Sequence, residues 1–148
     1  MSDNGFVNLS NQLAECKIAL WGGNIVSYRP KDEEHDIFWL GDLNKFDNVQ
    51  AIRGGVPVCW PRVAEEKLNG SLPRHGFARI SGWNLQKVLV DEKRMEAELS
   101  LLPDAKFNVR ASAVLSIRIS DKLEYRLETI NDGNAVSYTH LRAHETSL

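Results

Sequence analysis

The chain has 148 residues, of which 43% are hydrophobic and 26% are charged, and its formal net charge is -2. These values are typical of a globular protein with one hydrophobic core, and they provide no overall attraction to nucleic acid or to an anionic membrane. Any site for an anion must therefore be a local cluster of arginines or lysines.

The start of the chain, MSDNGFVNLSNQLAE, lacks a basic segment followed by an apolar run, and no later stretch has the ~18 apolar residues of a membrane span. We therefore expect a cytoplasmic protein that does not bind membranes. The two cysteines, Cys16 and Cys59, are far apart and have no metal-ligand spacing. We expect both to be reduced, with no disulfide and no metal site.

Two short apolar segments, residues 16–20 and 25–28, flank a Trp-Gly-Gly-Asn tetrapeptide at 21–24. Glycine can adopt the positive φ that a tight turn requires, so this pattern predicts a β-hairpin. Residues 36–40, DIFWL, have a high β propensity and precede a Gly-Asp terminator, so a further strand is expected there. Residues 44–82 show no regular pattern and are expected to be irregular.

Apolar and polar residues alternate over 95–101, 115–119 and 123–127, with the period of two of a half-buried strand. A three-residue loop between the last two segments pairs Ile119 with Leu123, whereas a two-residue loop would pair an inward residue with an outward one. We expect the longer loop, which also sets Arg118 opposite Glu124. Several such strands without an amphipathic helix predict an all-β protein with an antiparallel β-sandwich.

The end of the chain differs from the rest. Residues 136–148, VSYTHLRAHETSL, have neither clean alternation nor a closing signal, and they resemble translated vector sequence. We therefore expect residues 1–135 to form the N-terminal part of one sandwich domain. The tail at 136–148 is then a non-native extension, and the natural protein would continue beyond this point.

Residues 51–83 contain two notable segments, AIRGGVPVCWP at 51–61 and LPRHGFAR at 72–79. A loop of this length inside a compact domain is more often functional than accidental. Gly54 and Gly55 would expose backbone N–H groups and permit close approach, while Arg53 and Arg79 could form bidentate contacts with phosphate. The alternative is a glycine turn with two salt-bridged surface arginines, and a histidine at 75 that is structural.

The two segments, AIRGGVPVCWP and LPRHGFARISGW, resemble the paired signature of the hexose-6-phosphate mutarotases (glucose-6-phosphate 1-epimerases). WGGNIVSYRP and DIFWLG are similar to the opening hairpin and next strand of that family, and the resemblance covers residues 16–134. It implies a galactose mutarotase-like supersandwich that is truncated here. It also implies cofactor-free interconversion of the α and β anomers of a phosphorylated sugar by a monomer, with one acid and one base.

By this resemblance, Arg53 and Arg79 match the family's substrate-binding arginines, and His75 matches a histidine of the binding pocket. Arg74 precedes that histidine, where the family usually has a small or amide residue, and we count it among the substrate-binding candidates. His144 lies near the position of the catalytic acid, but its neighbours differ from those of the family. Departures from the family also begin at Arg62, where an aromatic and glycine stretch is common.

The family's catalytic base is a glutamate of the C-terminal half, which this sequence does not contain. The resemblance therefore implies a hexose-6-phosphate epimerase that is inactive as this fragment. Two alternatives remain open. One is a non-catalytic carbohydrate-binding or regulatory module on the same fold, and the other is an aldose 1-epimerase that acts on unphosphorylated sugar.

Overall fold

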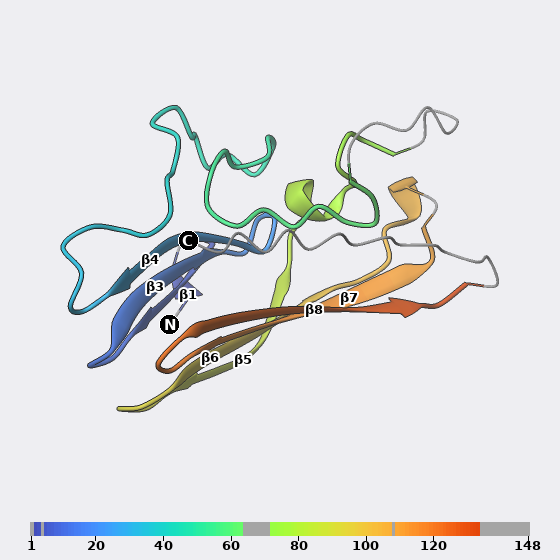
Figure 1. Cartoon of the computed structure of the whole chain (residues 1–148). Coiled ribbons are helices and arrows are strands. Elements are labelled where there is room, and N and C mark those ends of the chain that lie inside the picture. Colours follow the sequence, from blue (N-terminus) through green and yellow to red (C-terminus); the bar gives the residue numbers. More distant parts are fainter. Residues whose placement is uncertain (1, 4, 64–71, 108, 134–148) are drawn as a thin grey trace.

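The structure, a computed structural model, describes residues 2–3, 5–63, 72–107 and 109–133. It consists of two four-stranded antiparallel sheets (Figure 1). The first sheet contains β1 (Ser2–Asp3), β2 (Phe6–Ser10), β3 (Ala14–Ala19) and β4 (Asn24–Pro30), in that order. The second contains β5 (Asn84–Val90), β6 (Met95–Leu101), β7 (Ala111–Ile119) and β8 (Leu123–Asn131). The predicted all-β, antiparallel sandwich is confirmed.

The hairpin of β7 and β8 has the predicted register. Ile119 pairs with Leu123 and Arg118 stands opposite Glu124, as the three-residue loop requires. Both strands are longer than predicted, because pairing continues to Ala111 opposite Asn131. The first hairpin is also confirmed, since β3 and β4 pair on either side of the Trp-Gly-Gly-Asn turn.

The inward side chains of both sheets form one continuous hydrophobic core, as a half-buried alternation requires. On β7 these are Ala113, Leu115, Ile117 and Ile119, all of which are fully buried. The loops contribute to the same core through Phe77, which is fully buried and stacks on Phe107 at a centroid distance of 4.8 Å. Two short 3-10 turns, η1 (Ala78–Ile80) and η2 (Ala105–Phe107), carry neighbouring core residues. Within the described ranges, no helix is long and apolar enough to cross a membrane.

The strand expected at residues 36–40 is wrong. Only Leu40 forms an isolated bridge, to Gly54, and Trp39 is 72% exposed. The reason is the Asp36 carboxylate, which accepts hydrogen bonds from the backbone N–H groups of Tyr28 (3.1 Å) and Phe38 (2.8 Å). An aspartate that binds nearby backbone in this way favours a turn over a strand ladder.

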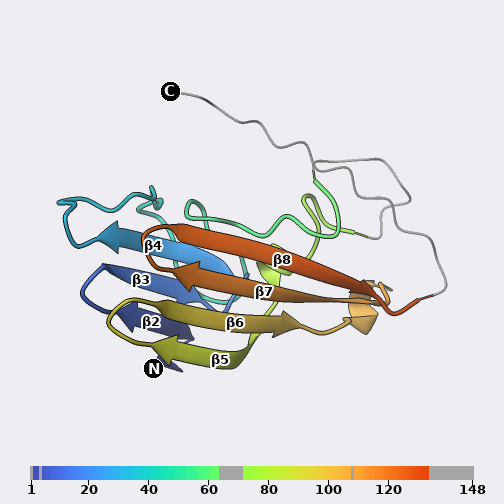
Figure 2. The same ribbon diagram turned by 60° about the horizontal axis from the view of Figure 1, so that its bottom comes forward.

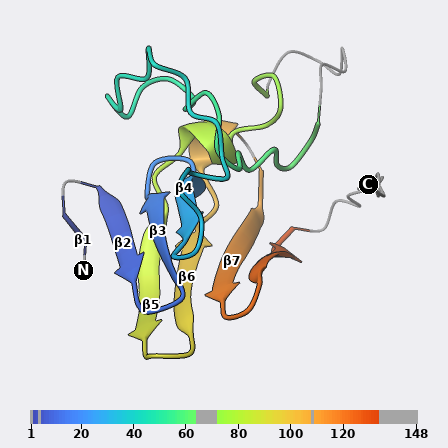
Figure 3. The ribbon, with the colours of Figure 1, turned by 60° about the vertical axis from the view of Figure 1, so that its left-hand side comes forward.

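The long connection between β4 and β5 starts beside the β2–β3 turn, where the Lys31 N–H donates to the Leu13 carbonyl at 2.8 Å, and then crosses to the other end of the sandwich (Figure 1). Its later part, which carries the candidate site residues, lies at that other end together with the turn between β3 and β4 (Figures 1 and 3). The turns that join β2 to β3, β5 to β6 and β7 to β8 lie at the opposite end (Figures 2 and 3). The segments that carry the candidate site residues therefore belong to a single end of the fold.

Candidate functional site

The two motif segments lie side by side. Trp60 and Gly76 form an isolated parallel bridge, and the N–H of Ala78 donates to the Trp60 carbonyl at 3.1 Å. Gly76 has a φ of 73°, and a Cβ atom there would lie 2.0 Å from the Trp60 carbonyl oxygen. Only glycine permits this approach. The segments that the sequence singled out are thus joined through their backbones.

The turn between β3 and β4 contacts both motif segments. Asn24 is 2% exposed, and its side chain donates to the Gly54 carbonyl (3.1 Å) and accepts from the Val56 N–H (2.8 Å). At the other side of the turn, the Gly22 N–H donates to the carbonyl of Ser81 at 2.8 Å. Ser81 lies two residues after Arg79. The sequence predicts only a turn at Asn24. Its type is common in turns, and no sequence signal showed that it would be buried against another loop.

Arg53 projects from a tightly held backbone. Its N–H donates to Asn44 Oδ1 (2.8 Å), and its carbonyl accepts from Asn44 Nδ2 (2.8 Å) and from the Gly41 N–H (3.0 Å). The residue itself is exposed, and its guanidinium forms no hydrogen bond or ion pair with the residues that the structure describes. It lines a hollow of about 330 Å³ together with Asn44, Lys45 and other residues of the same loop.

Gly54 and Gly55 permit close approach, but of one backbone to another. The Gly55 N–H donates to the Trp39 carbonyl at 2.9 Å. A Cβ atom would lie 2.3 Å from the Trp39 carbonyl oxygen at Gly54 and 2.3 Å from the Ile25 carbonyl oxygen at Gly55. The expectation that both glycines would offer N–H groups to an anion is therefore wrong for Gly55, whose N–H is already used.

Arg74 and His75 precede the 3-10 turn η1, which contains Arg79. The Arg79 Nη2 donates to the Arg74 carbonyl at 3.1 Å, while the Arg79 Nε is buried without a hydrogen-bond partner among the described residues. His75 adopts a positive φ of 61°, which is unusual for a residue other than glycine. Convergence of the Arg79 and Arg53 guanidinium groups on one pocket stays a prediction, and His144 lies outside the described residues.

Arg62, where the sequence departs from the family it resembles, has a structural role. Arg62 Nη2 donates to the carbonyl of Leu72 and to that of Pro73, the latter at 3.3 Å. The guanidinium therefore joins the end of the first motif segment to the start of the second, across the intervening residues. A guanidinium carries five N–H donors in a planar fork, so it is well suited to bridge two carbonyl oxygens.

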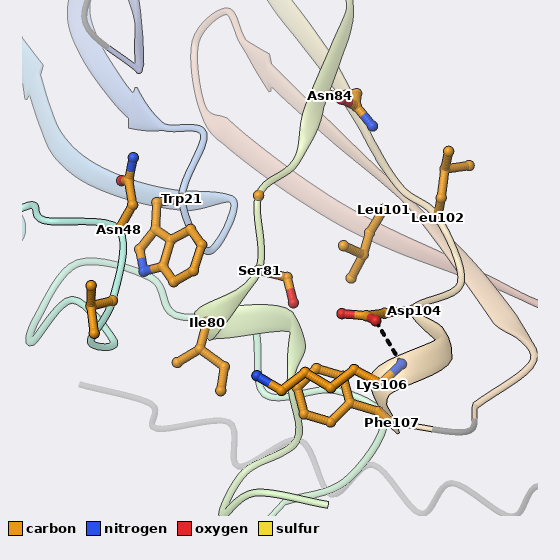
Figure 4. A pocket seen from close by; sticks show the side chains of 12 residues that line it. Trp21, Asn48, Ile80, Ser81, Asn84, Leu101, Leu102, Asp104, Lys106 and Phe107 are labelled. Atoms are coloured by element: carbon orange, nitrogen blue, oxygen red, sulfur yellow. Dashed lines mark hydrogen bonds between the residues drawn. The ribbon is translucent and has the colours of Figure 1, made fainter.

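A second cleft, of about 500 Å³, lies between the tips of the two sheets (Figure 4). Trp21, Ile80, Lys106 and Phe107 line it, and none of the four candidate substrate-binding residues does. Some of its polar groups are engaged within the chain, since Trp21 Nε1 donates to the Gln50 carbonyl at 2.9 Å. The cleft adjoins the candidate site and is distinct from the hollow at Arg53.

The cysteines are free in the structure, and Cys16 is buried. Burial raises the pKa of the Cys16 thiol to about 12, so the unreactive thiol form dominates near neutral pH. Among the described residues, no group of three or more histidine, cysteine or acidic side chains could hold a metal ion.

A family model described as "Aldose 1-epimerase" matches residues 6–140. A protein of Escherichia coli (strain K12) described as "Putative glucose-6-phosphate 1-epimerase" is 44% identical over 72 residues, covering 49% of this chain and 24% of that protein. A Haemophilus influenzae protein with the same description is 31% identical over 111 residues, covering 75% and 38%. The crystal structure of a "putative mutarotase" from Salmonella typhimurium has a TM-score of 0.77 at 27% identity. The match covers 84% of this chain and 43% of that one. The chain therefore spans less than half the length of these relatives.

Proposed function

Because the chain belongs to the aldose 1-epimerase family, we propose that it takes part in interconverting the α and β anomers of a hexose 6-phosphate. Its part in this reaction is to bind the phosphate of the sugar. Two of the relatives carry a description as a glucose-6-phosphate 1-epimerase, which supports a phosphorylated substrate.

The observation that carries this proposal is the state of Arg53. Its backbone is held by three hydrogen bonds, while its guanidinium is exposed and forms no bond to the described residues. A phosphate dianion needs charge-assisted donors, each worth about 1.5 to 3 kcal/mol. A guanidinium on a fixed backbone loses less freedom on binding than one on a mobile loop. Arg79, Arg74 and His75 are proposed to supply the remaining contacts.

The proposed reaction needs no net oxidation or reduction, and hence no redox cofactor. A base removes the proton of the anomeric hydroxyl while an acid protonates the ring oxygen, so the ring opens to an aldehyde. Rotation about the bond next to the aldehyde and reclosure then give the other anomer. The residues described here serve binding and orientation in this scheme, and the proposal does not assign the acid or the base to any of them.

The test is a calorimetric titration of the chain with glucose 6-phosphate and, separately, with glucose. We expect Arg53→Ala and Arg79→Ala each to weaken binding of the phosphorylated sugar by roughly ten- to hundredfold and to change glucose binding little. Arg126→Ala is the control, because Arg126 is an exposed arginine on β8 whose partner is Glu128. That change should leave the affinity for both sugars unaltered.

Equal loss of both sugars in the arginine variants would contradict phosphate binding and assign the arginines to hydroxyl contacts or to structure. Wild-type binding of glucose as tight as that of its 6-phosphate would favour an aldose 1-epimerase that acts on unphosphorylated sugar. Magnetisation exchange between the anomers that is faster with the chain than without it, as followed by NMR, would show that the chain itself catalyses the reaction and is not a binding module.

A further inference from the structure

The side chain of Asn44 holds the backbone of Arg53 on both of its polar groups. Asn44 Oδ1 accepts from the Arg53 N–H, and Asn44 Nδ2 donates to the Arg53 carbonyl, both at 2.8 Å. The same Nδ2 donates to the Gly41 carbonyl at 2.8 Å. The Asn44 amide thus pairs with the N–H and the carbonyl of Arg53, as the backbone of a neighbouring strand would do in a sheet.

The chemistry of this clamp requires an amide. The Arg53 N–H is a donor, so the asparagine atom that faces it must be the oxygen, and the nitrogen then faces the carbonyl. Aspartate offers no donor for the carbonyl, and serine has one short hydroxyl that cannot serve both groups of one residue. The amide therefore fixes where the Arg53 side chain leaves the backbone.

The loop that Asn44 closes, residues 44–53, is held by single contacts, among them the hydrogen bond from Trp21 Nε1 to the Gln50 carbonyl. Phe46 and Asn48 have positive φ values of 48° and 57°, a conformation that is costly outside glycine and persists only when the surroundings enforce it. Phe46 packs edge-on against Phe6 at a centroid distance of 5.4 Å. Asp47 accepts from the Val49 N–H (3.0 Å) within the loop itself. The clamp at Asn44 joins the start of this loop to Arg53, whose carbonyl also accepts from the Gly41 N–H at 3.0 Å.

We infer that Asn44 is a positioning residue for phosphate binding, which acts through Arg53 without touching the substrate. The inference rests on the proposed function. Asn44 orders the backbone of Arg53 before the ligand arrives, so binding does not have to supply that order. The contrasting interpretation is a loop asparagine that stabilises the fold and has no effect on ligand affinity beyond folding.

A double-mutant cycle separates the two interpretations. The dissociation constant for glucose 6-phosphate is measured by calorimetry for the wild-type chain, Asn44→Ala, Arg53→Ala and the double variant. We expect Asn44→Ala to weaken binding about fivefold, equivalent to about 1 kcal/mol. In the Arg53→Ala background it should weaken binding no further, because residues that act through one another are not additive. Glucose binding should not change.

Asn11→Ala is the matched control. Asn11 also uses its amide as a local clamp, since it accepts from the Leu13 N–H (2.9 Å) and donates to the Asp91 carbonyl (2.8 Å). Asp91 follows β5, so this clamp lies at the opposite end of the sandwich from the candidate site. We expect a similar loss of thermal stability in both asparagine variants, and a loss of phosphate-sugar affinity in Asn44→Ala alone.

Unchanged affinity in Asn44→Ala, an effect that persists in full without Arg53, or an equal loss in Asn11→Ala would each overturn the inference. If Asn44→Ala does not fold, as judged by circular dichroism, Asn44→Gln carries the test. The longer amide can pair its polar groups but displaces Arg53, so the same coupled loss is expected. The proposed function itself is refuted if the wild-type chain does not bind glucose 6-phosphate. It is also refuted if Arg53→Ala binds this sugar as tightly as the wild-type chain.

Discussion

The sheets and the loops between β4 and β5 are stabilised by different interactions. In the sheets, alternate side chains such as Leu115 and Ile117 are fully buried, and the backbone is paired in regular ladders. In the loops, single atoms determine the structure. The Asn44 amide and the missing Cβ of Gly76 are two examples, and the Asn24 amide at the start of β4 holds the loop backbone at Val56. A sheet of this kind tolerates exchange of one apolar residue for another, whereas the loops depend on individual residue identities.

The two regions nevertheless share one core. Val58, Trp60 and Phe77 from the loops belong to the same buried cluster as Leu115 and Ile117 from the second sheet. Trp60 contacts Phe77 edge-on at a centroid distance of 5.4 Å. The loops are thus one wall of the core rather than a separate cover, and a change in them should lower the stability of the whole chain.

The largest effect is expected from Gly76→Ala. The new Cβ would lie 2.0 Å from the Trp60 carbonyl oxygen, at a φ of 73°. Relief requires that the two motif segments separate and expose Phe77, so the free energy of unfolding in urea should fall by about 4 kcal/mol. Gly82→Ala is the control, because a Cβ at Gly82 meets nothing within 4 Å. Equal stability of the two variants would show that the loops are independent of the core.

The next effect concerns the sheet side of the same core. Leu115→Ala removes a fully buried side chain from the middle of β7 and should lower the free energy of unfolding by about 3 kcal/mol. Leu115→Met, which roughly conserves volume, should cost less than about 1.5 kcal/mol. Urea unfolding followed by tryptophan fluorescence measures both. A cost for Leu115→Met as large as that for Leu115→Ala would contradict the tolerance inferred for the sheets.

The same contrast explains how much of the fold the sequence predicts. Residues 95–101, 115–119 and 123–127 alternate strictly, and the register of β7 with β8 follows from that pattern. The sequence does not predict β5, because its pairing with β6 shifts between Leu85 and Lys87 and this shift breaks the alternation of apolar and polar residues. The segment at 36–40 has the composition of a strand, yet the hydrogen bonds that Asp36 accepts turn it into a loop.

The candidate site is predicted less completely. The glycine-rich motif and its neighbour at 72–79 could be recognised, and their adjacency at Trp60 and Gly76 agrees with that reading. The two asparagines that hold the first motif could not be found, because they act across 30 residues at Asn24 and 9 residues at Asn44. No periodic pattern in the sequence links residues that are 9 or 30 positions apart. Contacts of this kind depend on tertiary structure alone.

The smallest effect expected tests whether a polar residue of the sheets behaves like those of the loops. Glu96 on β6 is 9% exposed and lies 3.2 Å from Lys87 Nζ and 3.3 Å from Arg118 Nε. The hydrogen bond from Lys87 and the nearby arginines outweigh burial and lower the pKa of Glu96 below its ordinary value of 4.5. Its ionised form is therefore favoured by folding. That stabilisation is complete above the unfolded-state pKa and is lost as pH falls through the folded-state pKa.

Glu96→Gln should consequently lower the free energy of unfolding by no more than about 1 kcal/mol at neutral pH, since its cationic partners are largely exposed. The difference from wild type should shrink as the pH falls below the ordinary pKa of 4.5, and it should vanish once the pH is below the lowered pKa of Glu96 in the folded state. Urea unfolding at several pH values measures this, with Glu98→Gln as the control. Glu98 lies on the same strand and forms no ion pair among the described residues, so its replacement should leave the pH profile unchanged. A loss at neutral pH as large as that of Leu115→Ala would show that the outer face of this sheet also depends on single polar atoms, and the distinction between sheets and loops would then fail.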